Sequence, residues 1–355
     1  MLEIRCTGTP YEIGNQHGTQ AKDKVAGSIS FYKDLFQATC DLDWAEVSQQ
    51  ASTYVESLQK LCPRYVEEIQ GLADGAGVQF LDVLALNVRT EIMFGLFTHD
   101  PSLDIKSDGC TSLACQNPSG TMLLAQNWDW QVRQAANLFV CHISQPDTSL
   151  PNIAMVTEGG VIGKIGLNSS GVGVCLNAIR ARGLDPSKLP VHLALRTALE
   201  SKSRAAAIEQ INAAGIAGSA HILLSDEFGA TGLECTSIGI KEIQMDGDGS
   251  IVHANHLVLE HPGVDEPVWL PDSPHRTARI DKLLKGKASS SPITASSLFE
   301  LFKDEQGFPE AINRCQVGTS DVETLFNIIM DLGEKKAIVS VGRPTEYTQR
   351  IELSF

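Results

Sequence analysis

The amino-acid sequence changes character after Asp108. Before this residue, apolar side chains recur at three- and four-residue spacing, as between Val47 and Leu72, which is typical of amphipathic helices. After it, Cys110 to Gln116 and Thr121 to Trp128 are short, β-prone runs that flank a turn-forming Asn-Pro-Ser-Gly. A chain that passes from helices to hairpins in this way is expected to pack helices against β-sheets.

The rest of the chain alternates between strand-like and helix-like patterns. Strand-like runs spaced as hairpins are followed by two helices, four more strands, a further helix and a closing hairpin. This order predicts an α+β fold, a four-layer αββα sandwich of two antiparallel sheets, and no linker divides its 355 residues into domains. The expected helices begin near residues 9 and 43 and span 80–94, 190–201, 204–214 and 295–303, and the expected strands after the first hairpin are 138–143, 153–157, 162–167, 171–176, 221–225, 230–235, 239–244, 250–253, 325–330 and 337–341.

Composition and charge argue against two classes of partner. The chain carries 43 acidic and 28 basic residues, a formal net charge of −15, and its basic residues form no cluster in the sequence. Nucleic acids and anionic membranes bind basic surfaces, so neither is an expected partner. The longest apolar runs fall far short of the roughly 20 residues that a membrane-spanning helix requires.

The cysteines and the ends of the chain favour the cytoplasm. Nine cysteines without paired CxxC spacing fit a reducing compartment. The first residues lack the apolar stretch of a signal peptide, and the final ELSF is not a peroxisomal tripeptide. His253 and His256 form an HxxH, but zinc needs further ligands at suitable spacing, so we expect neither a metal nor a bound cofactor.

Gly109 and Cys110 stand at the start of the first expected hairpin. A cysteine thiol can attack the carbonyl on its own N-terminal side, and hydrolysis of the resulting thioester cuts the chain. A glycine before it tolerates strained backbone geometry and places no Cβ in the path of attack. The new N-terminal cysteine then holds a thiol and an α-amine with a pKa of about 8, which can act as general base. A buried structural cysteine is the alternative reading.

Several sequence blocks resemble one enzyme family. DGCTS at 108–112, QNWDW at 126–130 and GTPYEIGNQHG at 8–18 are similar to the isopenicillin-N acyltransferases, also called acyl-CoA:6-aminopenicillanic acid acyltransferases. That family belongs to the N-terminal-nucleophile hydrolases. The likeness continues through blocks at 86–92, 158–178, 219–227, 252–256 and 324–346 and covers nearly the whole chain.

The resemblance implies an αββα sandwich made as an inactive precursor, or zymogen, that cleaves itself between Gly109 and Cys110. Residues 1–109 would become a small subunit, and residues 110–355 a large subunit that begins with the nucleophile. The two pieces would stay associated as a heterodimer without a covalent link. Thr111 would assist this autocatalytic cleavage.

The resemblance also implies roles for residues distant from the cut. Asp129 would hold the amine of Cys110, and the side-chain amide of Asn255 would donate to the oxyanion. Arg314 would lower the thiol pKa or bind a substrate carboxylate, and a surface or interdomain salt bridge is its alternative. Asn177 and Ser112 are possible oxyanion or substrate contacts, and each has an ordinary structural role as its alternative.

The function expected from these residues is acyl transfer through an acyl-Cys110 intermediate. The donor would be a thioester such as acyl-CoA, acting as co-substrate, or an amide, and the acceptor an amine such as a β-lactam, as in penicillin biosynthesis, or a peptide-like molecule. The first alternative is an amidohydrolase in which water takes the acyl group. The second is a binding protein that keeps the fold without catalysis.

Overall fold

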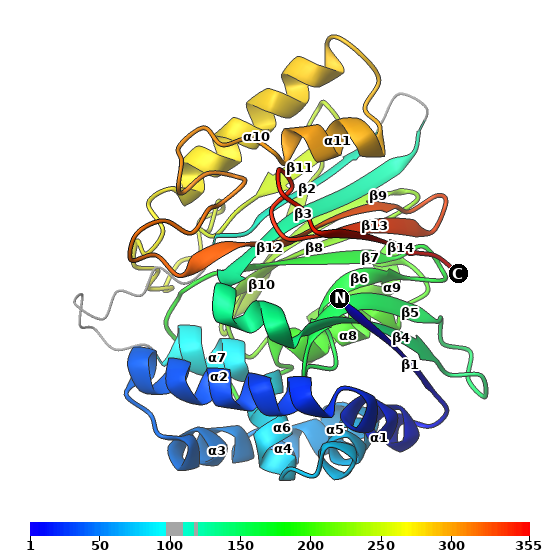
Figure 1. The fold of residues 1–355 in the computed structure, drawn as a ribbon, viewed down its shortest axis with the longest axis vertical. Helices are drawn as coiled ribbons and strands as arrows, with labels where there is room; N and C mark the ends of the chain where they lie inside the picture. Colours follow the sequence, from blue (N-terminus) through cyan, green and yellow to red (C-terminus); the bar gives the residue numbers. More distant parts are fainter. Residues whose placement is uncertain (97–108, 117–119) are drawn as a thin grey trace.

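Two β-sheets lie face to face between two layers of helices (Figure 1). The computed structural model describes residues 1–96, 109–116 and 120–355. Over these residues the four-layer αββα arrangement is confirmed, and most predicted helices and strands are present, together with strands at 2–7 and 349–353 and a helix at 273–288 that were not predicted. The predicted turn at 117–120 lies mostly outside the described residues.

The first sheet contains eight of the described strands in the order β1-β4-β5-β6-β7-β8-β9-β10. All its neighbours are antiparallel except β1 and β4, which pair in parallel from Leu2↔Phe139 to Thr7↔Ser144. The antiparallel prediction is therefore wrong at this edge, where the chain returns from a distant segment. The strands are β1 (Leu2–Thr7), β4 (Leu138–Ser144), β5 (Ile153–Glu158), β6 (Ile165–Asn168), β7 (Gly173–Ala178), β8 (Ala220–Asp226), β9 (Gly229–Thr236) and β10 (Gly239–Gln244).

The second sheet contains six described strands in the order β11-β2-β3-β12-β13-β14, all antiparallel. The strands β2 and β3 lie in this sheet, whereas the next strands along the chain, β4 to β7, lie in the first sheet. The spacing of hydrophobic residues predicts a strand but does not indicate which sheet the strand joins. The strands are β2 (Thr111–Gln116), β3 (Met122–Gln131), β11 (Ser250–His253), β12 (Val322–Asp331), β13 (Lys336–Val341) and β14 (Gln349–Leu353).

One helical layer covers the outer face of the first sheet and the other covers the second sheet (Figure 1). The helix expected at 80–94 is two helices, because the chain turns at Val88. The first layer contains α1 (Pro10–Gln20), α2 (Lys22–Cys40), α3 (Trp44–Ser52), α4 (Val55–Leu61), α5 (Pro63–Ala76), α6 (Phe80–Asn87), α7 (Arg89–Gly95), α8 (Val191–Leu199) and α9 (Arg204–Ala214), and the second contains α10 (Ser273–Ala288) and α11 (Ala295–Leu301).

Alternation along β2 decides which side chains reach the inter-sheet space. Ala114 packs in the large core between the sheets, whereas Leu113 and Cys115 pack in a smaller core under α10 and α11. Cys110 belongs to the large core and so continues the inner row of β2. Successive strand residues point to opposite faces, which places the thiol between the sheets.

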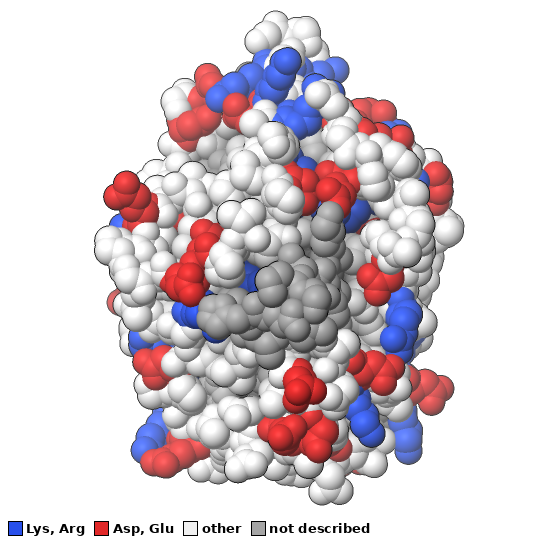
Figure 2. All heavy atoms as spheres, turned by 90° about the vertical axis from the view of Figure 1, so that its left-hand side faces the viewer, with Lys and Arg blue, Asp and Glu red and all other residues white. Residues whose placement is uncertain are grey.

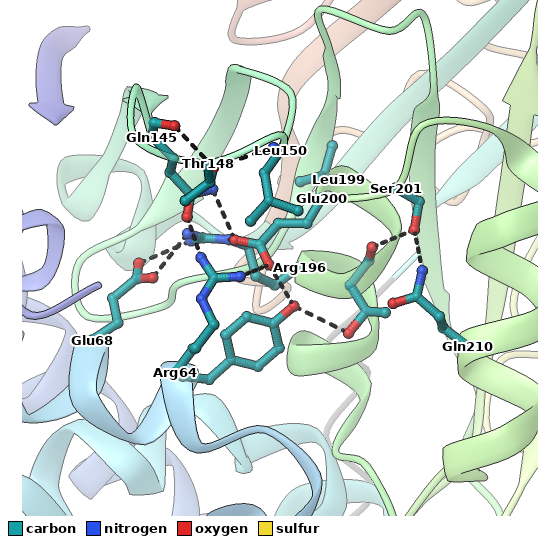
Figure 3. Close-up of polar contacts among 12 residues, drawn as sticks. Arg64, Glu68, Gln145, Thr148, Leu150, Arg196, Leu199, Glu200, Ser201 and Gln210 are labelled. Atoms are coloured by element: carbon teal, nitrogen blue, oxygen red, sulfur yellow. Dashed lines mark hydrogen bonds and ion pairs between the residues drawn. The ribbon is translucent and has the colours of Figure 1, made fainter. Parts of the chain in front are cut away.

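Buried polar contacts join the segment before residue 97 to the segment after residue 109. In Figure 3, Glu68 of α5 reaches Arg196 of α8, and the two make paired hydrogen bonds of 2.8 Å. Arg196 also contacts Glu200, which accepts from the hydroxyl of Tyr65 at 3.1 Å. Arg89 of α7 pairs with Glu158 at the end of β5, at 2.7 Å. Because ion pairs without exposure to water are screened weakly, these contacts hold the layer of helices on the first sheet.

Acidic and basic side chains are interspersed on the face shown in Figure 2. This distribution agrees with the absence of a basic cluster in the sequence. Among the described residues, each helix is too short or too polar to cross a bilayer.

Candidate active site

Cys110 lies directly before β2 and is almost fully buried, with 1% of its surface exposed. Because Thr111 pairs with Asn127, Cys110 stands opposite Trp128 on β3, one step beyond the paired stretch. Its Sγ lies 3.8 Å from the carbonyl oxygen of Asp129, to which the thiol donates a weak hydrogen bond. The hairpin therefore fixes the cysteine at the edge of the inter-sheet core.

The carbonyl oxygen of Cys110 accepts two hydrogen bonds. Asn177 Nδ2, from β7 of the other sheet, donates at 3.1 Å, and Arg276, from α10, donates at 2.7 Å. The same guanidinium nitrogen of Arg276 contacts Thr111 Oγ1 at 3.1 Å. Groups from both sheets and the outer helical layer thus meet at the backbone of the cysteine.

Two donors set the orientation of the Asn177 amide. Ser112 Oγ donates to Asn177 Oδ1 at 2.6 Å, and Nδ1 of His221 lies 3.1 Å from the same oxygen. Burial holds the pKa of His221 well below its usual range, so the ring is neutral with its proton on Nδ1. With its oxygen engaged, Asn177 turns its NH2 group toward Cys110.

Asn255 follows β11 and is also buried. Its Oδ1 accepts from Arg276 at 2.9 Å, and its Nδ2 donates to the carbonyl of Ala178 at 3.0 Å. The backbone N–H of Asn255 donates to Ser273 Oγ at 2.7 Å. Arg276 therefore links the two residues expected to stabilise negative charge, Asn255 directly and Asn177 through Cys110.

Arg314 lies against Gly109. A Cβ added at Gly109 would lie 2.1 Å from Nε and 2.7 Å from Cζ of Arg314, so any other residue here must displace the guanidinium. Nε of Arg314 is 3.5 Å from Asp129 Oδ2, and the other oxygen of Asp129 accepts from Thr324 at 2.6 Å. Arg314 therefore contacts both Gly109 and Asp129, the carboxylate that is expected to hold the amine of Cys110.

Asp272 joins the two arginines. It accepts from Nε of Arg276 at 2.7 Å and from a terminal nitrogen of Arg314. Burial raises the pKa of Asp272, but the two guanidinium groups outweigh it and hold the pKa below its usual range. The cluster is a chain of alternating charges: Asp129, Arg314, Asp272 and Arg276.

The structure thus brings every sequence-predicted site residue near Cys110. Gly109, Thr111, Ser112, Asp129, Asn177, Asn255 and Arg314 all lie in this one network. Sequence reasoning missed Asp272 and Arg276, because α10 was not expected. The signal was present: Pro274 in the first turn marks a helix start, and Asp272 and Arg276 are spaced to pair along a helix.

Two hollows flank this cluster. One, of about 680 Å³, includes Arg314, Gln131, Arg133 and Cys315 in its wall. The other, of about 600 Å³, includes Asp272, Arg276 and His275. Each is of the size that small-molecule sites occupy. Within the part of the chain that the structure describes, no group of three or more His, Cys, Asp or Glu side chains is arranged to hold a metal ion.

Comparisons with known proteins identify the family of this chain. The family model of acyl-coenzyme A:6-aminopenicillanic acid acyltransferase matches residues 115–346. The 40 kDa form of that acyltransferase from Emericella nidulans is 40% identical over 358 residues, which span 100% of this chain and 96% of the relative. The chain belongs to the acyl-coenzyme A:6-aminopenicillanic acid acyltransferase family. It is an enzyme of the acyltransferase or amidohydrolase type, with a small-molecule acyl donor and acceptor.

More distant similarities of this family member extend to hydrolases. A beta-alanyl-dopamine/carcinine hydrolase from Drosophila melanogaster is 24% identical over 59% of this chain and 56% of its own length. Among solved structures, a mutant of the conjugated bile acid hydrolase from Clostridium perfringens matches with a TM-score of 0.49 and 15% identity, over 69% of this chain and 92% of that one. Penicillin V acylase from Agrobacterium tumefaciens matches with a TM-score of 0.47 and 14% identity, over 65% and 83%.

Proposed function

We propose that this protein is a self-processing acyltransferase whose nucleophile is Cys110. The observation that carries the proposal is the surroundings of the Gly109–Cys110 bond. Gly109 leaves no free room for a Cβ beside Arg314, the Cys110 thiol is buried, and the carbonyl of Cys110, on the far side of that residue from the proposed cut, accepts from Asn177 and Arg276. Buried polar side chains are costly unless they are paired, and a cluster of this extent fits a reaction site better than an ordinary core position.

Cleavage begins when the Cys110 thiol attacks the carbonyl carbon of Gly109. The new C–S bond forms as the C–N bond breaks, and the amine takes the proton, which leaves a thioester. Water then hydrolyses that thioester, releasing residue 109 with a carboxylate and Cys110 with a free thiol and amine. Residues 1–109 and 110–355 would remain together through β1 and the buried ion pairs of α5 and α7.

Acyl transfer uses the same thiol. Cys110 attacks the carbonyl of the acyl donor, the leaving group departs with a proton, and an acyl-thioester enzyme remains. The amine acceptor then attacks this thioester, which forms the amide and restores the thiol. The released α-amine of Cys110 is the proposed general base, with Asp129 and Arg314 beside it.

The oxyanion of each step would be stabilised by Asn255 and Asn177. Each Asn amide has a second N–H beyond the one that donates in the uncut chain, and Arg276 holds Asn255 by its oxygen. Preorganised donors of this kind are worth roughly 3 kcal/mol of barrier each. Thr111 and Ser112 are proposed to hold Arg276 and Asn177 in place.

The relative's name suggests the substrates. It specifies acyl-coenzyme A as donor and 6-aminopenicillanic acid as acceptor for that protein, and we propose the same reaction class here, with a β-lactam amine or a peptide-like amine as acceptor. In the proposed steps the acyl donor acts as co-substrate, and residues of this protein supply the other reacting groups.

Mass spectrometry of purified protein tests the cleavage. We expect two polypeptides, the larger beginning with Cys110, and a single uncut chain from Cys110→Ala. Two pieces from Cys110→Ala would contradict the proposal. An uncut, inactive wild-type chain would support the non-catalytic alternative.

A product assay separates transferase from hydrolase. With an acyl-CoA donor alone, slow release of free acid is expected, and added 6-aminopenicillanic acid should divert the acyl group into amide. A product that stays free acid at saturating amine would favour the amidohydrolase alternative.

A further inference from the structure

A second charged cluster lies beside Trp128, the cross-strand neighbour of Cys110. Lys164, just before β6, has a fully buried side chain and pairs with Glu158. Glu158 also accepts from Arg89 at 2.7 Å and from the hydroxyl of Tyr32. The proposed reaction steps use none of these groups.

The ammonium of Lys164 reaches the strand that faces Cys110. Its Nζ lies 4.0 Å from the ring centroid of Trp128. Trp128 is the cross-strand neighbour of Cys110, one step past the Thr111↔Asn127 pair, and directly opposed residues project their side chains on the same face of a sheet. Cys110 and Trp128 both belong to the inter-sheet core. The cation of the first sheet and the thiol of the second sheet therefore point into the same space.

Charge couples the two groups. Burial lowers the pKa of Lys164 to about 8, while the charges of Glu158 and of a Cys110 thiolate raise it and Arg89 lowers it. Coupling of this kind is mutual, so a cation that is favoured by the thiolate also favours the thiolate. The other groups that face Lys164 are His192 of α8, whose ring is neutral, and Tyr32 through Glu158.

We propose that Lys164 is a positioning residue for the reaction, whose buried ammonium stabilises the Cys110 thiolate from the inter-sheet side. This inference rests on the proposed role of Cys110 as nucleophile. Glu158 pairs with the ammonium, which lies over the ring of Trp128. The nucleophile would then lie near two cationic side chains, Arg314 beside Gly109 and Lys164 over Trp128.

The proposal is tested by titrating the thiol itself. In cysteine-labelled protein the Cβ resonance of Cys110, assigned by its loss in Cys110→Ser, reports ionisation directly by NMR. The midpoint in wild-type protein is the reference for the variants. Lys164→Met should raise it by about 1 to 3 pH units, a 10- to 1,000-fold loss of thiolate at neutral pH. Lys164→Arg, which keeps the charge, should raise it less.

Two controls separate charge from structure. Lys60→Met removes an exposed lysine and should leave the midpoint unchanged. Cys115, in the same strand but on the outer face, has a thiol pKa of about 12 because of burial, and Lys164→Met should not move it. The acidic limb of the pH dependence of kcat/KM should shift with the Cys110 midpoint, which a merely structural role would not produce.

A reciprocal measurement needs no Lys164 variant. The Nζ titration of Lys164 should move to lower pH in Cys110→Ser, because the thiolate that favours the ammonium is gone. Equal Cys110 midpoints in wild type and Lys164→Met, or a Lys164 titration that ignores Cys110→Ser, would overturn this inference. If the chain still cleaves itself and transfers acyl groups, the proposed function stands. A Cys110→Ala chain that is cut and active would overturn the proposed function instead.

Discussion

At the scale of single residues, the arrangement around Cys110 depends on the small size of Gly109 and on the several donors of each arginine. Gly109 leaves room for the Arg314 guanidinium, and that guanidinium is held by Asp129 and Asp272 so that it cannot swing aside cheaply. Arg276 divides its donors among Cys110, Thr111 and Asn255. A planar fork with several donors can do this, whereas lysine offers a point charge.

Gly109→Ala is therefore expected to slow or block self-cleavage. The new Cβ overlaps Arg314 and must displace either the guanidinium or the scissile bond. The measurement is the fraction of cut chain over time on a denaturing gel. Gly239→Ala is the matched control, because a Cβ there meets nothing within 4 Å. Cleavage of Gly109→Ala at the wild-type rate would contradict the role assigned to this contact.

Arg276→Lys is expected to reduce kcat/KM by about 100- to 1,000-fold, because Asn255 loses the donor that orients its amide. Arg279→Lys is the control on the same helix, since Arg279 pairs with Asp304 away from Cys110. Steady-state rates and melting temperatures of the two variants are compared. Equal rates in both would show that the orientation of Asn255 does not depend on Arg276.

At the scale of elements, α5 and α8 are joined across the proposed cut. Figure 3 shows Glu68 and Arg64 of α5 directed at Arg196 and Glu200 of the α8 segment. The β1–β4 pairing adds a row of backbone contacts between the same two parts of the chain. Self-cleavage would remove the covalent tether, so these contacts would then carry the association alone.

Arg196→Met should destabilise the protein by about 3–5 kcal/mol, because Glu68 and Glu200 are left buried without their shared cation. The effect should be larger in the cut enzyme than in uncut Cys110→Ala, where the tether still holds the pieces. Urea unfolding and co-elution of the two pieces measure it. Lys60→Met, which removes an exposed pair, should cost less than about 1 kcal/mol. Equal loss in cut and uncut chains would refute the bridging role.

At the scale of the whole molecule, buried histidines link stability to pH. Burial, followed by the charge of Arg196, lowers the pKa of His17 to about 3. The pKa values of His192 and His221 are also held well below the usual range by burial. These rings stay neutral in the folded chain, whereas the unfolded chain protonates them below pH of about 6.5.

The contribution of these three rings to the free energy of unfolding should therefore be constant above about pH 6.5 and fall as the pH is lowered, by up to about 1.4 kcal/mol per pH unit for each buried ring. Chemical unfolding at about pH 7 and about pH 5 measures the slope. His17→Gln should remove one histidine's share, since glutamine can still accept from the Gly160 N–H that contacts His17. An unchanged slope in this variant would contradict the assignment.

Local sequence patterns predicted most helices and strands. They did not predict elements that are stabilised by contacts with distant parts of the chain. α9, β10 and β11 have the expected bounds. The strand β1 was not predicted because its partner β4 follows more than a hundred residues later. The strand β14 was not predicted because it is an edge strand with polar side chains. The prolines around α10 concealed a helix, although one of them marks its start.

The sequence by itself determined the chemistry that this chain can attempt. Short sequence blocks were enough to select Gly109 and Cys110. The same kind of block selected Asp129, Asn177, Asn255 and Arg314, because each stands within a short recognisable motif. Only the tertiary structure decided which charges surround the thiol. Arg276 lies 166 positions from Cys110 along the chain, and Lys164 comes from the other sheet. Electrostatic effects depend on distance and burial in space, which no spacing along the sequence encodes.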